Sequence, residues 1–270
     1  MTIVTISRGS FSMGRAVAEK AARRLGFECL SRDVLIEASD KFNIPEIKLV
    51  NAIIDAPSFF RRFTHEQESY IAYIQSALTR HLCRDNVVYH GLAGHVFLKN
   101  VSHVLKVCII ASFETRVANL MKSEKVTERE AASWITKVDK ERRKWTKQLY
   151  GVDPWDPQLY DIVLKIDKFD SDEAAESIFQ SARLPRFQAT KESQREMEDL
   201  ALACEIKAEL VGKFPGIKVT STSGNIILYE DSGDHNRRKL QRSANGLLTK
   251  IKGINNIEIH EGVSSPPTAV

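Results

Sequence analysis

The sequence has few of the features that mark secreted, cysteine-metal or membrane-spanning proteins. Its 270 residues include four cysteines, and none of them forms a CxxC pair. This spacing argues against a disulfide framework and a cysteine-ligated metal, and it favours a reducing compartment. No stretch approaches the ~20 apolar residues of a membrane-spanning helix, and the N-terminus opens on a strand-like run instead of a signal peptide. We therefore expect a cytoplasmic protein.

The charge imbalance is small, and the chain has no internal repeat or low-complexity tract. Net charge is +4, with 27% charged and 43% apolar residues, enough apolar material for a packed core. The positive surplus suits an anionic ligand such as a nucleotide. It is too small to indicate a nucleic-acid partner without a concentrated patch. An ordinary surface with slightly more lysine explains the surplus equally well.

Short apolar runs alternate with segments of helical periodicity through the first two-thirds of the chain. The predicted strands are Thr2–Ile6, Val87–Tyr89, Val104–Ile110 and Ile162–Ile166. The predicted helices are Gly14–Leu25, Asp33–Phe42, Thr64–Arg84, Phe113–Ser123, one that opens at a Thr127–Glu130 capping box, and Asp170–Ala182. This alternation indicates βαβ units, and hence an α/β domain with a parallel sheet buried on both faces.

The pattern changes after residue 184. Residues 185–192 include Pro185 and mixed polar residues, and we predict a linker there. Beyond it the expected order is αββαβ, in the segments Ser193–Leu210, Ile217–Thr220, Ile226–Tyr229, His235–Ile251 and Ile254–Ile259. A Gly-Asn pair between the first two strands is typical of a hairpin turn. We expect a first domain over 1–184, a small α+β domain over 193–262 and a tail over 263–270.

The segment Ser7–Ala16 lies between the first predicted strand and the first predicted helix. Gly9 and Gly14 have the spacing of a Walker A phosphate-binding loop, with Arg15 at the lysine position. Such a loop points backbone N–H groups at phosphate oxygens, assisted by the positive end of the helix dipole. The alternative is an ordinary βα turn with two glycines and a surface arginine. On the functional interpretation, the phosphate-binding residues are Gly9, Ser10, Ser12, Met13, Gly14, Arg15 and Ala16.

Further stretches follow this loop in a recognisable order. They are Ile6–Arg8, Gly14–Arg15, Ala18–Lys20, Ser31–Leu35, Val87–Val88 with Gly91, Glu114–Val117, Asp139–Arg143, Tyr150–Asp153, Trp155–Pro157 and Leu159–Leu164. Through these stretches, residues 1 to about 182 resemble the cytidylate kinase-like family, of the P-loop nucleoside-monophosphate kinase type. The resemblance implies a five-stranded parallel sheet, ATP with Mg²⁺ on the loop, a nucleoside-monophosphate acceptor site and a basic lid.

In this sequence the lid corresponds to the helix that follows Thr127. Its basic residues are Lys137, Lys140, Arg142, Arg143, Lys144 and Lys147. The resemblance implies that Arg142 and Arg143, with Arg15, act as the catalytic cations, because phosphoryl transfer needs charge neutralised around the transferred group. The alternative is a solvated helix face whose cations pair locally with Asp139 and Glu141.

The resemblance also implies an acceptor site, from Arg32, Asp33, Gly91 and Arg116. Asp33 alternatively caps a helix. Leu92 stands where the family has an arginine, and Leu92 cannot supply a bidentate cation. This departure weakens the case for cytidine monophosphate as the acceptor.

The loop departs from the family pattern as well. Phe11 and Met13 stand where the family usually has glycine. If these positions need left-handed backbone, each side chain costs roughly 1–2 kcal/mol; a differently shaped loop is the alternative. Ala16 and Val17 remove the hydroxyl that would ligate Mg²⁺, and we assign no metal-ligating residue.

Other residues carry weaker indications. His90 and His95 flank the Gly91–Gly94 segment, where they would bond a phosphate or base, although a loop or core histidine fits equally. The three tryptophans, Trp134, Trp145 and Trp155, fit core or lid packing better than a base-stacking platform.

The C-terminal region resembles a BON-type domain, a module used for binding or assembly. The residues that carry the resemblance are Ile206, Leu210, Val219, Gly224–Leu228, Leu247 and Ile251–Ile257. It offers no nucleophile–base pair, and its partner is unknown. A basic run over Arg237, Arg238, Lys239 and Arg242 is typical of a solvated helix face.

Two functional hypotheses follow. The first is ATP-dependent phosphoryl transfer to a nucleoside monophosphate or a similar small acceptor. The second is a catalytically weak or inactive nucleotide-binding or sensing protein that acts through its C-terminal domain. Both need a small nucleotide as partner and leave homo-oligomer formation open. Neither nucleic acid nor membrane is indicated.

Overall fold

The chain forms two compact units in a computed structural model. The model describes residues 1–31, 33–46, 48–49, 65–91, 93–98, 100–230 and 237–270. The first unit comprises the described residues of 1–32 and 85–189, and the second unit comprises those of 33–84 and 190–270. Among the described residues, no helix is both long and apolar enough to cross a membrane.

The first unit is built on a five-stranded parallel sheet, as expected. Its strands are β1 (Ile3–Arg8), β2 (Glu28–Leu30), β3 (Val87–Tyr89), β4 (Val104–Ile110) and β5 (Ile162–Lys165), in the order β2-β3-β1-β4-β5. Ile3 of β1 pairs with Val87 on one side and Val104 on the other. The central strands are buried on both faces, which explains why they appear in the sequence as continuous apolar runs.

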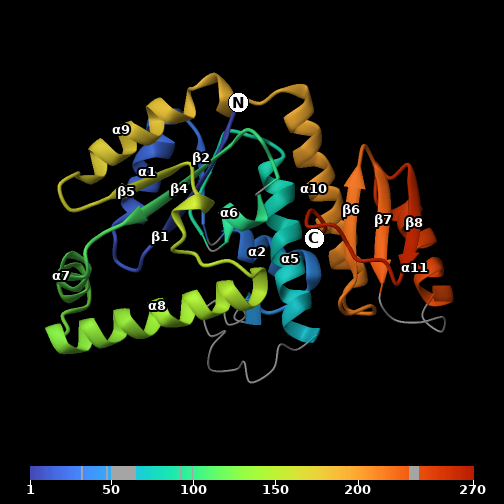
Figure 1. The fold of residues 1–270 in the computed structure, drawn as a ribbon, viewed down its shortest axis with the longest axis horizontal. Helices are drawn as coiled ribbons and strands as arrows, with labels where there is room; N and C mark the ends of the chain where they lie inside the picture. Colours follow the sequence, from blue (N-terminus) through green and yellow to red (C-terminus); the bar gives the residue numbers. More distant parts are fainter. Residues whose placement is uncertain (32, 47, 50–64, 92, 99, 231–236) are drawn as a thin grey trace. The chain divides into compact units, whose positions relative to one another are not determined.

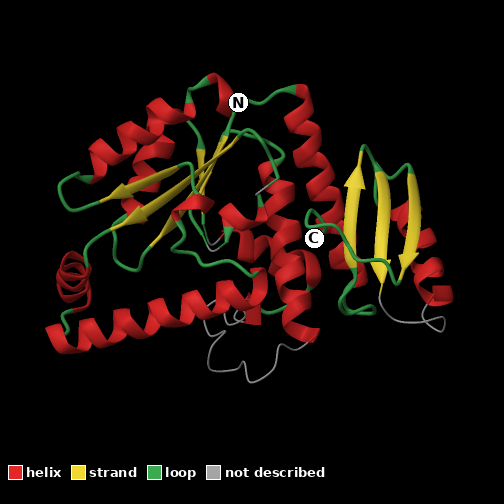
Figure 2. Ribbon diagram, in the orientation of Figure 1, coloured by secondary structure: helices red, strands yellow, loops and turns green. Residues whose placement is uncertain are grey.

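Helices flank this sheet (Figure 2). They are α1 (Gly14–Leu25), α6 (Gly94–Phe97), α7 (Phe113–Glu124), α8 (Glu128–Tyr150) and α9 (Ser171–Ala182). The capping box predicted at Thr127 is present, with Thr127 and Glu130 bonded reciprocally. Two short 3₁₀ turns, η1 (Pro157–Leu159) and η2 (Pro185–Phe187), complete the unit.

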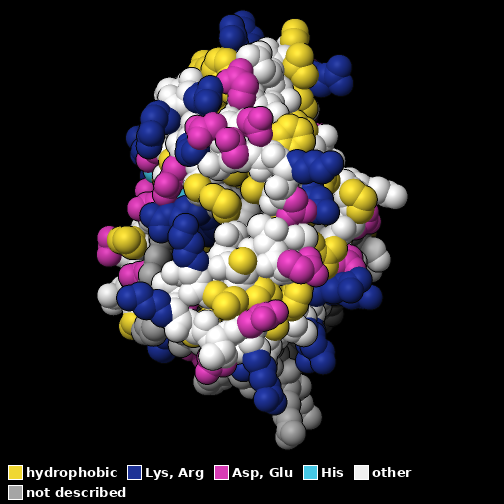
Figure 3. All heavy atoms as spheres, turned by 90° about the vertical axis from the view of Figure 1, so that its left-hand side faces the viewer, with side chains coloured by type: hydrophobic (Ala, Val, Ile, Leu, Met, Phe, Trp, Pro, Cys, Tyr) yellow, Lys and Arg dark blue, Asp and Glu magenta, His cyan; other side chains and the backbone are white. Residues whose placement is uncertain are grey.

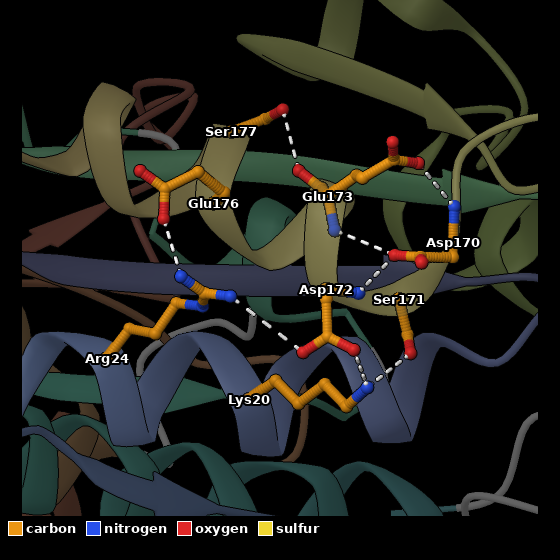
Figure 4. Close-up of polar contacts among 8 residues, drawn as sticks. All are labelled: Lys20, Arg24, Asp170, Ser171, Asp172, Glu173, Glu176 and Ser177. Atoms are coloured by element: carbon orange, nitrogen blue, oxygen red, sulfur yellow. Dashed lines mark hydrogen bonds and ion pairs between the residues drawn. The ribbon is translucent and has the colours of Figure 1, made fainter.

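Helices α1 and α9 lie side by side over one face of the sheet (Figure 1). Their small residues allow close approach, and the core between them and the sheet includes Val4, Ile6, Val17, Ala18, Ala21, Val107, Ala174 and Ile178. At the rim, the Lys20 ammonium bonds Ser171 and Asp172, and the Arg24 guanidinium bonds Glu176 at 2.7 Å (Figure 4). These contacts fix the axis of α1, whose N-terminus therefore stays at the end of β1.

The described part of the second unit contains four helices and a three-stranded sheet. Its elements are α2 (Asp33–Phe42), α5 (His65–Leu82), α10 (Lys191–Leu210), β6 (Lys218–Thr222), β7 (Asn225–Glu230), α11 (Arg237–Lys250) and β8 (Asn256–Glu261). Strands β6 and β7 are antiparallel, and β7 and β8 are parallel. From α10 onward the elements occur in the expected order αββαβ. In the predicted tail, Val270 exchanges two backbone hydrogen bonds with Val219 of β6.

The grouping of α2 and α5 differs from the sequence-based domain boundaries. Both helices lie within the predicted 1–184 domain, yet they cluster with α10 in the second unit. The Lys41 ammonium of α2 bonds Glu205 of α10 at 2.8 Å, for example. The predicted linker contains η2, and the Ala189 amide bonds the Met1 carbonyl at 2.7 Å. Contacts between residues so distant along the chain leave no local sequence signal.

A buried lysine in the second unit generates a pH-dependent prediction. The Lys207 side chain is 6% exposed, and its ammonium lies 3.8 Å from Glu68. Burial, and then the nearby Lys218 charge, lowers the pKa of Lys207 from 10.5 to about 8. At pH values between about 8 and 10.5, Lys207 is protonated in the unfolded chain and neutral in the folded chain. Its contribution to the free energy of unfolding therefore rises with pH over this range.

Replacing the residue in a Lys207→Met variant removes that dependence. The Glu68 carboxylate keeps the Gly216 amide as a donor, at 2.9 Å, so the variant leaves it bonded. We expect the variant to exceed wild type in unfolding free energy at pH 7, with the gap shrinking by up to about 1.4 kcal/mol per pH unit above pH 8. Urea denaturation from pH 7 to 10 measures the gap. A gap independent of pH contradicts the prediction.

Candidate functional site

The loop between β1 and α1 adopts left-handed backbone at the two positions where glycine was expected. Phe11 has a φ of 58° and Met13 a φ of 59°. The first of the two alternatives left open by the sequence is therefore the one observed. Each of these residues bears a cost of about 1–2 kcal/mol that glycine would not.

The loop is braced against the neighbouring strand β4. The Gly9 amide donates to the Ile109 carbonyl at 3.1 Å. The buried Ser12 hydroxyl bonds the Gly9 carbonyl at 2.9 Å and the Ile109 carbonyl at 3.2 Å. The loop lies at the carboxyl end of β1, where the connections through α1 and through α7 diverge to opposite sides. Ligands of open parallel sheets bind at such switch points.

Several donors of the loop stay unpaired. Helix α1 has no side-chain cap and no acidic residue in its first turn. Among the described residues, no acceptor takes the amides of Met13, Gly14, Arg15 or Ala16. The buried hydroxyl of Ser10 also has no partner within the described part of the chain. These donors, with the positive end of the α1 dipole, form a site suited to an anion.

Three arginines contact the same loop. The Arg116 Nε donates to the Ser10 carbonyl at 2.7 Å, and an Arg142 Nη donates to the Arg8 carbonyl at 3.2 Å. The Arg8 side chain lies against Gly14, so closely that a Cβ on Gly14 would fall 2.6 Å from the Arg8 Cβ. We call Arg8, Arg116 and Arg142 the arginine cluster.

The arginine cluster concentrates positive charge in a partly buried place. Burial lowers the pKa of Arg142, the Arg8 and Arg116 charges lower it further, and only Asp139 acts in the other direction. Asp139 accepts two bonds of 2.8 Å from Arg116. Guanidinium groups stay protonated in proteins, so a bound anion, not proton loss, relieves this repulsion.

On the face that carries α7, basic and acidic side chains are interspersed with scattered hydrophobic ones (Figure 3). The arginine cluster gathers three cations at the loop, although the net charge of the chain is only +4.

Comparisons with known proteins place the chain in a family. A model of the cytidylate kinase-like family matches residues 3–168, more than half of the chain. The chain belongs to the cytidylate kinase-like family. The match spans the phosphate loop, the arginine cluster and α8.

Individual relatives are more distant. The cytidylate kinases of Methanopyrus kandleri and Methanosarcina acetivorans are 34% identical over 96 residues and 35% identical over 91 residues. Each alignment covers 33% of this chain, and 50% and 49% of the two relatives, so the chain spans about half the length of these relatives. An uncharacterized protein from Eubacterium ventriosum has a similar fold, with a TM-score of 0.53 and 22% identity over 68% of this chain and 99% of that one.

The three cations predicted to be catalytic lie in different surroundings. Arg142 contacts the loop, as described above. Arg15 is exposed and bonds Glu19 one turn along α1, at 2.7 Å. Arg143 bonds Asp153 through two nitrogens and joins α8 to the segment that follows it. Arg15 thus matches the surface-arginine alternative, whereas Arg143 pairs with Asp153 and not with the expected Asp139 or Glu141. The phosphate contacts of both residues remain predictions.

The predicted acceptor residues belong to both units, and their assembly into one site stays a prediction. Arg116 belongs to the arginine cluster, whereas Asp33 begins α2 in the second unit. Gly91 packs against Tyr89, whose ring would collide with any Cβ there. Arg32 and Leu92 lie outside the described residues.

His95 is a buried histidine with bonded partners inside the first unit. Its Nδ1 lies 2.7 Å from the Ser7 hydroxyl, and its Nε2 lies 3.3 Å from the Tyr160 hydroxyl. Burial lowers the pKa of His95 to about 4, so the ring is neutral at physiological pH. The structure favours the core-histidine interpretation for this residue, which ties β1 to the segment after α8.

Two residues near the loop were missing from the predicted site. Arg8 belongs to the Ile6–Arg8 stretch that carries the family resemblance, and this was the signal available. The Trp155 ring lies 3.6 Å from the position of a Cβ on Gly9, beside the Arg116 guanidinium. Nothing in the local sequence places that ring over the loop. Trp145, in contrast, is buried against Tyr150, as packing predicted.

The described residues fit the phosphates of ATP better than they fit a dedicated magnesium cage. The unpaired amides and the Ser10 hydroxyl suit phosphate oxygens. Ala16 offers no hydroxyl, and the Ser12 hydroxyl already bonds two carbonyls. Within the described part of the chain, no group of three or more His, Cys, Asp or Glu is placed to hold a metal. Mg²⁺ held mainly by substrate phosphates and water needs no such group.

The close packing of Gly14 on Arg8 generates a second prediction. Gly14→Ala places a Cβ 2.6 Å from the Arg8 Cβ, an atom fixed by the backbone of β1. We expect the variant to lose about 1–3 kcal/mol of unfolding free energy through this overlap. Urea denaturation monitored by circular dichroism measures the loss.

Gly246→Ala in α11 is the matched control. A Cβ on Gly246 meets nothing within 4 Å. Since alanine favours the helix, this variant should gain about 0.5–1 kcal/mol. Equal changes in unfolding free energy for Gly14→Ala and Gly246→Ala would contradict the prediction, because they would show that the loop accommodates the added Cβ without a loss of stability.

Proposed function

We propose that this protein is an ATP-dependent phosphotransferase whose acceptor is a nucleoside monophosphate or a similar small molecule. The observation that carries the proposal is the arginine cluster on a loop with unpaired amides. The membership of the cytidylate kinase-like family and the kinase names of the two archaeal relatives support it.

The chain's own groups perform binding and charge neutralisation. The amides from Met13 to Ala16 and the Ser10 hydroxyl hold phosphate oxygens, and Arg142 and Arg116 neutralise charge around the transferred group. ATP supplies the phosphoryl group, together with the Mg²⁺ that its phosphates carry. An acceptor oxygen forms a bond to the γ-phosphorus while the bond to the bridging oxygen breaks, and ADP leaves. Positioning and electrostatic stabilisation account for most catalysis of this reaction.

Arg15 is free to join this site at little cost. Its bond to Glu19 is an exposed pair within one helix, and exposed pairs contribute little to stability. A phosphate at the start of α1 would compete with Glu19 for the guanidinium. Arg143 is held differently, because Asp153 takes two of its nitrogens. We therefore rank Arg142 and Arg15 ahead of Arg143 as phosphate partners.

The acceptor side of the proposal rests on fewer contacts. Arg116 presents a guanidinium at the loop, but Asp139 occupies two of its nitrogens. An acceptor phosphate that binds Arg116 must share the guanidinium with the Asp139 carboxylate or displace that carboxylate. Leu92 removes the arginine that the family uses, so we propose an acceptor class and no single nucleotide.

Replacing the cation that contacts the loop from α8 tests the proposal. In an assay of ADP release across ribo- and deoxynucleoside monophosphates, Arg142→Met should lower kcat/KM by about 10²-fold, equivalent to about 2.7 kcal/mol. The physical reason is the loss of a cation preorganised beside the transferred charge.

Arg129→Met is the control, since Arg129 lies exposed in the first turn of the same helix and should change kcat/KM less than about twofold. Equal kcat/KM of Arg142→Met and wild type would show that the arginine cluster takes no part in the mechanism. Saturable ATP binding without turnover on any acceptor would instead support the nucleotide-sensing alternative.

A further inference from the structure

The phosphate loop is held by α7 and α8 through its carbonyl groups. Arg116 of α7 donates to the Ser10 carbonyl, and Asn119 of α7 donates to the Phe11 carbonyl at 2.9 Å. Arg142 of α8 donates to the Arg8 carbonyl. These bonds come from α7 and from α8, the helix predicted to form the lid.

The Phe11 side chain adds an apolar contact to these bonds. Its ring meets Trp134 of α8 edge to face, with ring centroids 5.4 Å apart and an interplanar angle of 73°. It also packs on the small core that joins α7 to α8, formed by Val117, Leu120, Ala131 and Ile135. Phe11 is therefore the loop's contribution to the core of the α7–α8 pair.

Met13 supplies an internal comparison. Both residues have the same left-handed backbone, which is unfavourable for any residue but glycine. The Met13 side chain is 43% exposed, and it is not part of the core that joins α7 to α8. At Phe11, the contacts with α7 and α8 offset part of the backbone cost.

We infer that Phe11 is a positioning residue that latches the α7–α8 pair to the phosphate loop in the ligand-free protein. It acts through Arg116 and Arg142, which reach the loop only if both helices stay docked. The basic helix is then in place before nucleotide binds. Such preorganisation lowers the entropic cost of binding and of assembling the site. The inference rests on the proposed function only for the identity of the ligand.

Hydrogen exchange on the ligand-free protein tests the latch directly. We compare wild type, Phe11→Gly and Met13→Gly, since both variants restore glycine at a left-handed position. In Phe11→Gly, amides of α8 from Ala131 to Arg142 should exchange at least about tenfold faster than in wild type. In Met13→Gly, their exchange should match wild type. Equal exchange in the two variants overturns the latch.

A ligand arm separates a docked helix from one that closes on nucleotide. With saturating ATP, exchange in α8 should change by less than about twofold in wild type, whereas Phe11→Gly should regain protection. A tenfold gain of protection in wild type would mean closure on binding and would refute the inference. If ATP fails to bind wild type at all, the proposed function fails, while the ligand-free comparison still decides the latch.

Two further variants address the possibility that Phe11→Gly misfolds. Trp134→Ala removes the other ring from a residue that is 47% exposed and leaves the loop sequence intact. It should speed α8 exchange in the same region, and less than additively with Phe11→Gly, because both remove one contact. Phe11→Tyr keeps the ring and should restore wild-type exchange. Additive effects, or no rescue by tyrosine, would show that the ring contact is not the latch.

Discussion

The first unit depends on an electrostatic constraint: three guanidinium groups share one partly buried place, where the carboxylates of Asp139 and Glu19 offset only part of their positive charge. Arg8, Arg116 and Arg142 cannot relieve their repulsion by losing protons. Backbone carbonyls of the loop and the Asp139 carboxylate provide part of the compensation. The remaining positive charge faces a loop whose amides also lack acceptors. This positive charge and these amides together favour the binding of an anion, which is the physical basis of the proposed phosphate chemistry.

The same contacts explain why a loop with two unfavourable residues is tolerated. Left-handed backbone at Phe11 and Met13 costs free energy that the family's usual glycines avoid. Phe11 recovers part of it in the core of the α7–α8 pair, and the loop carbonyls gain side-chain donors from the same helices. The loop, α7 and α8 thus behave as one packed body, with Arg142 directed inward by the packing that supports the loop.

Much of the fold followed from the sequence, and less of the site did. The parallel sheet, the position of the loop and the capping box at Thr127 were all predictable, because periodicity, glycine spacing and capping are local signals. Arg15 and Arg143 were predicted at the phosphates; in the structure they pair with Glu19 and Asp153, and their phosphate contacts stay predictions. Phe11 was recognised as a departure from the family, but its contact with Trp134, 123 positions along the chain, had no sequence signal.

The sequence by itself determined a parallel α/β domain with a loop of Walker A-like glycine spacing after its first strand, because each element is encoded by short-range pattern. Tertiary structure alone decided which cations serve that loop. Helical spacing separates Arg142 from Arg143 by about 100°, but it does not say which of the two faces inward. Packing of α8 against α7 and the loop makes that choice. Tertiary structure also places Arg8 against Gly14 of the loop. It groups α2 and α5 with the C-terminal helices through contacts between residues far apart along the chain.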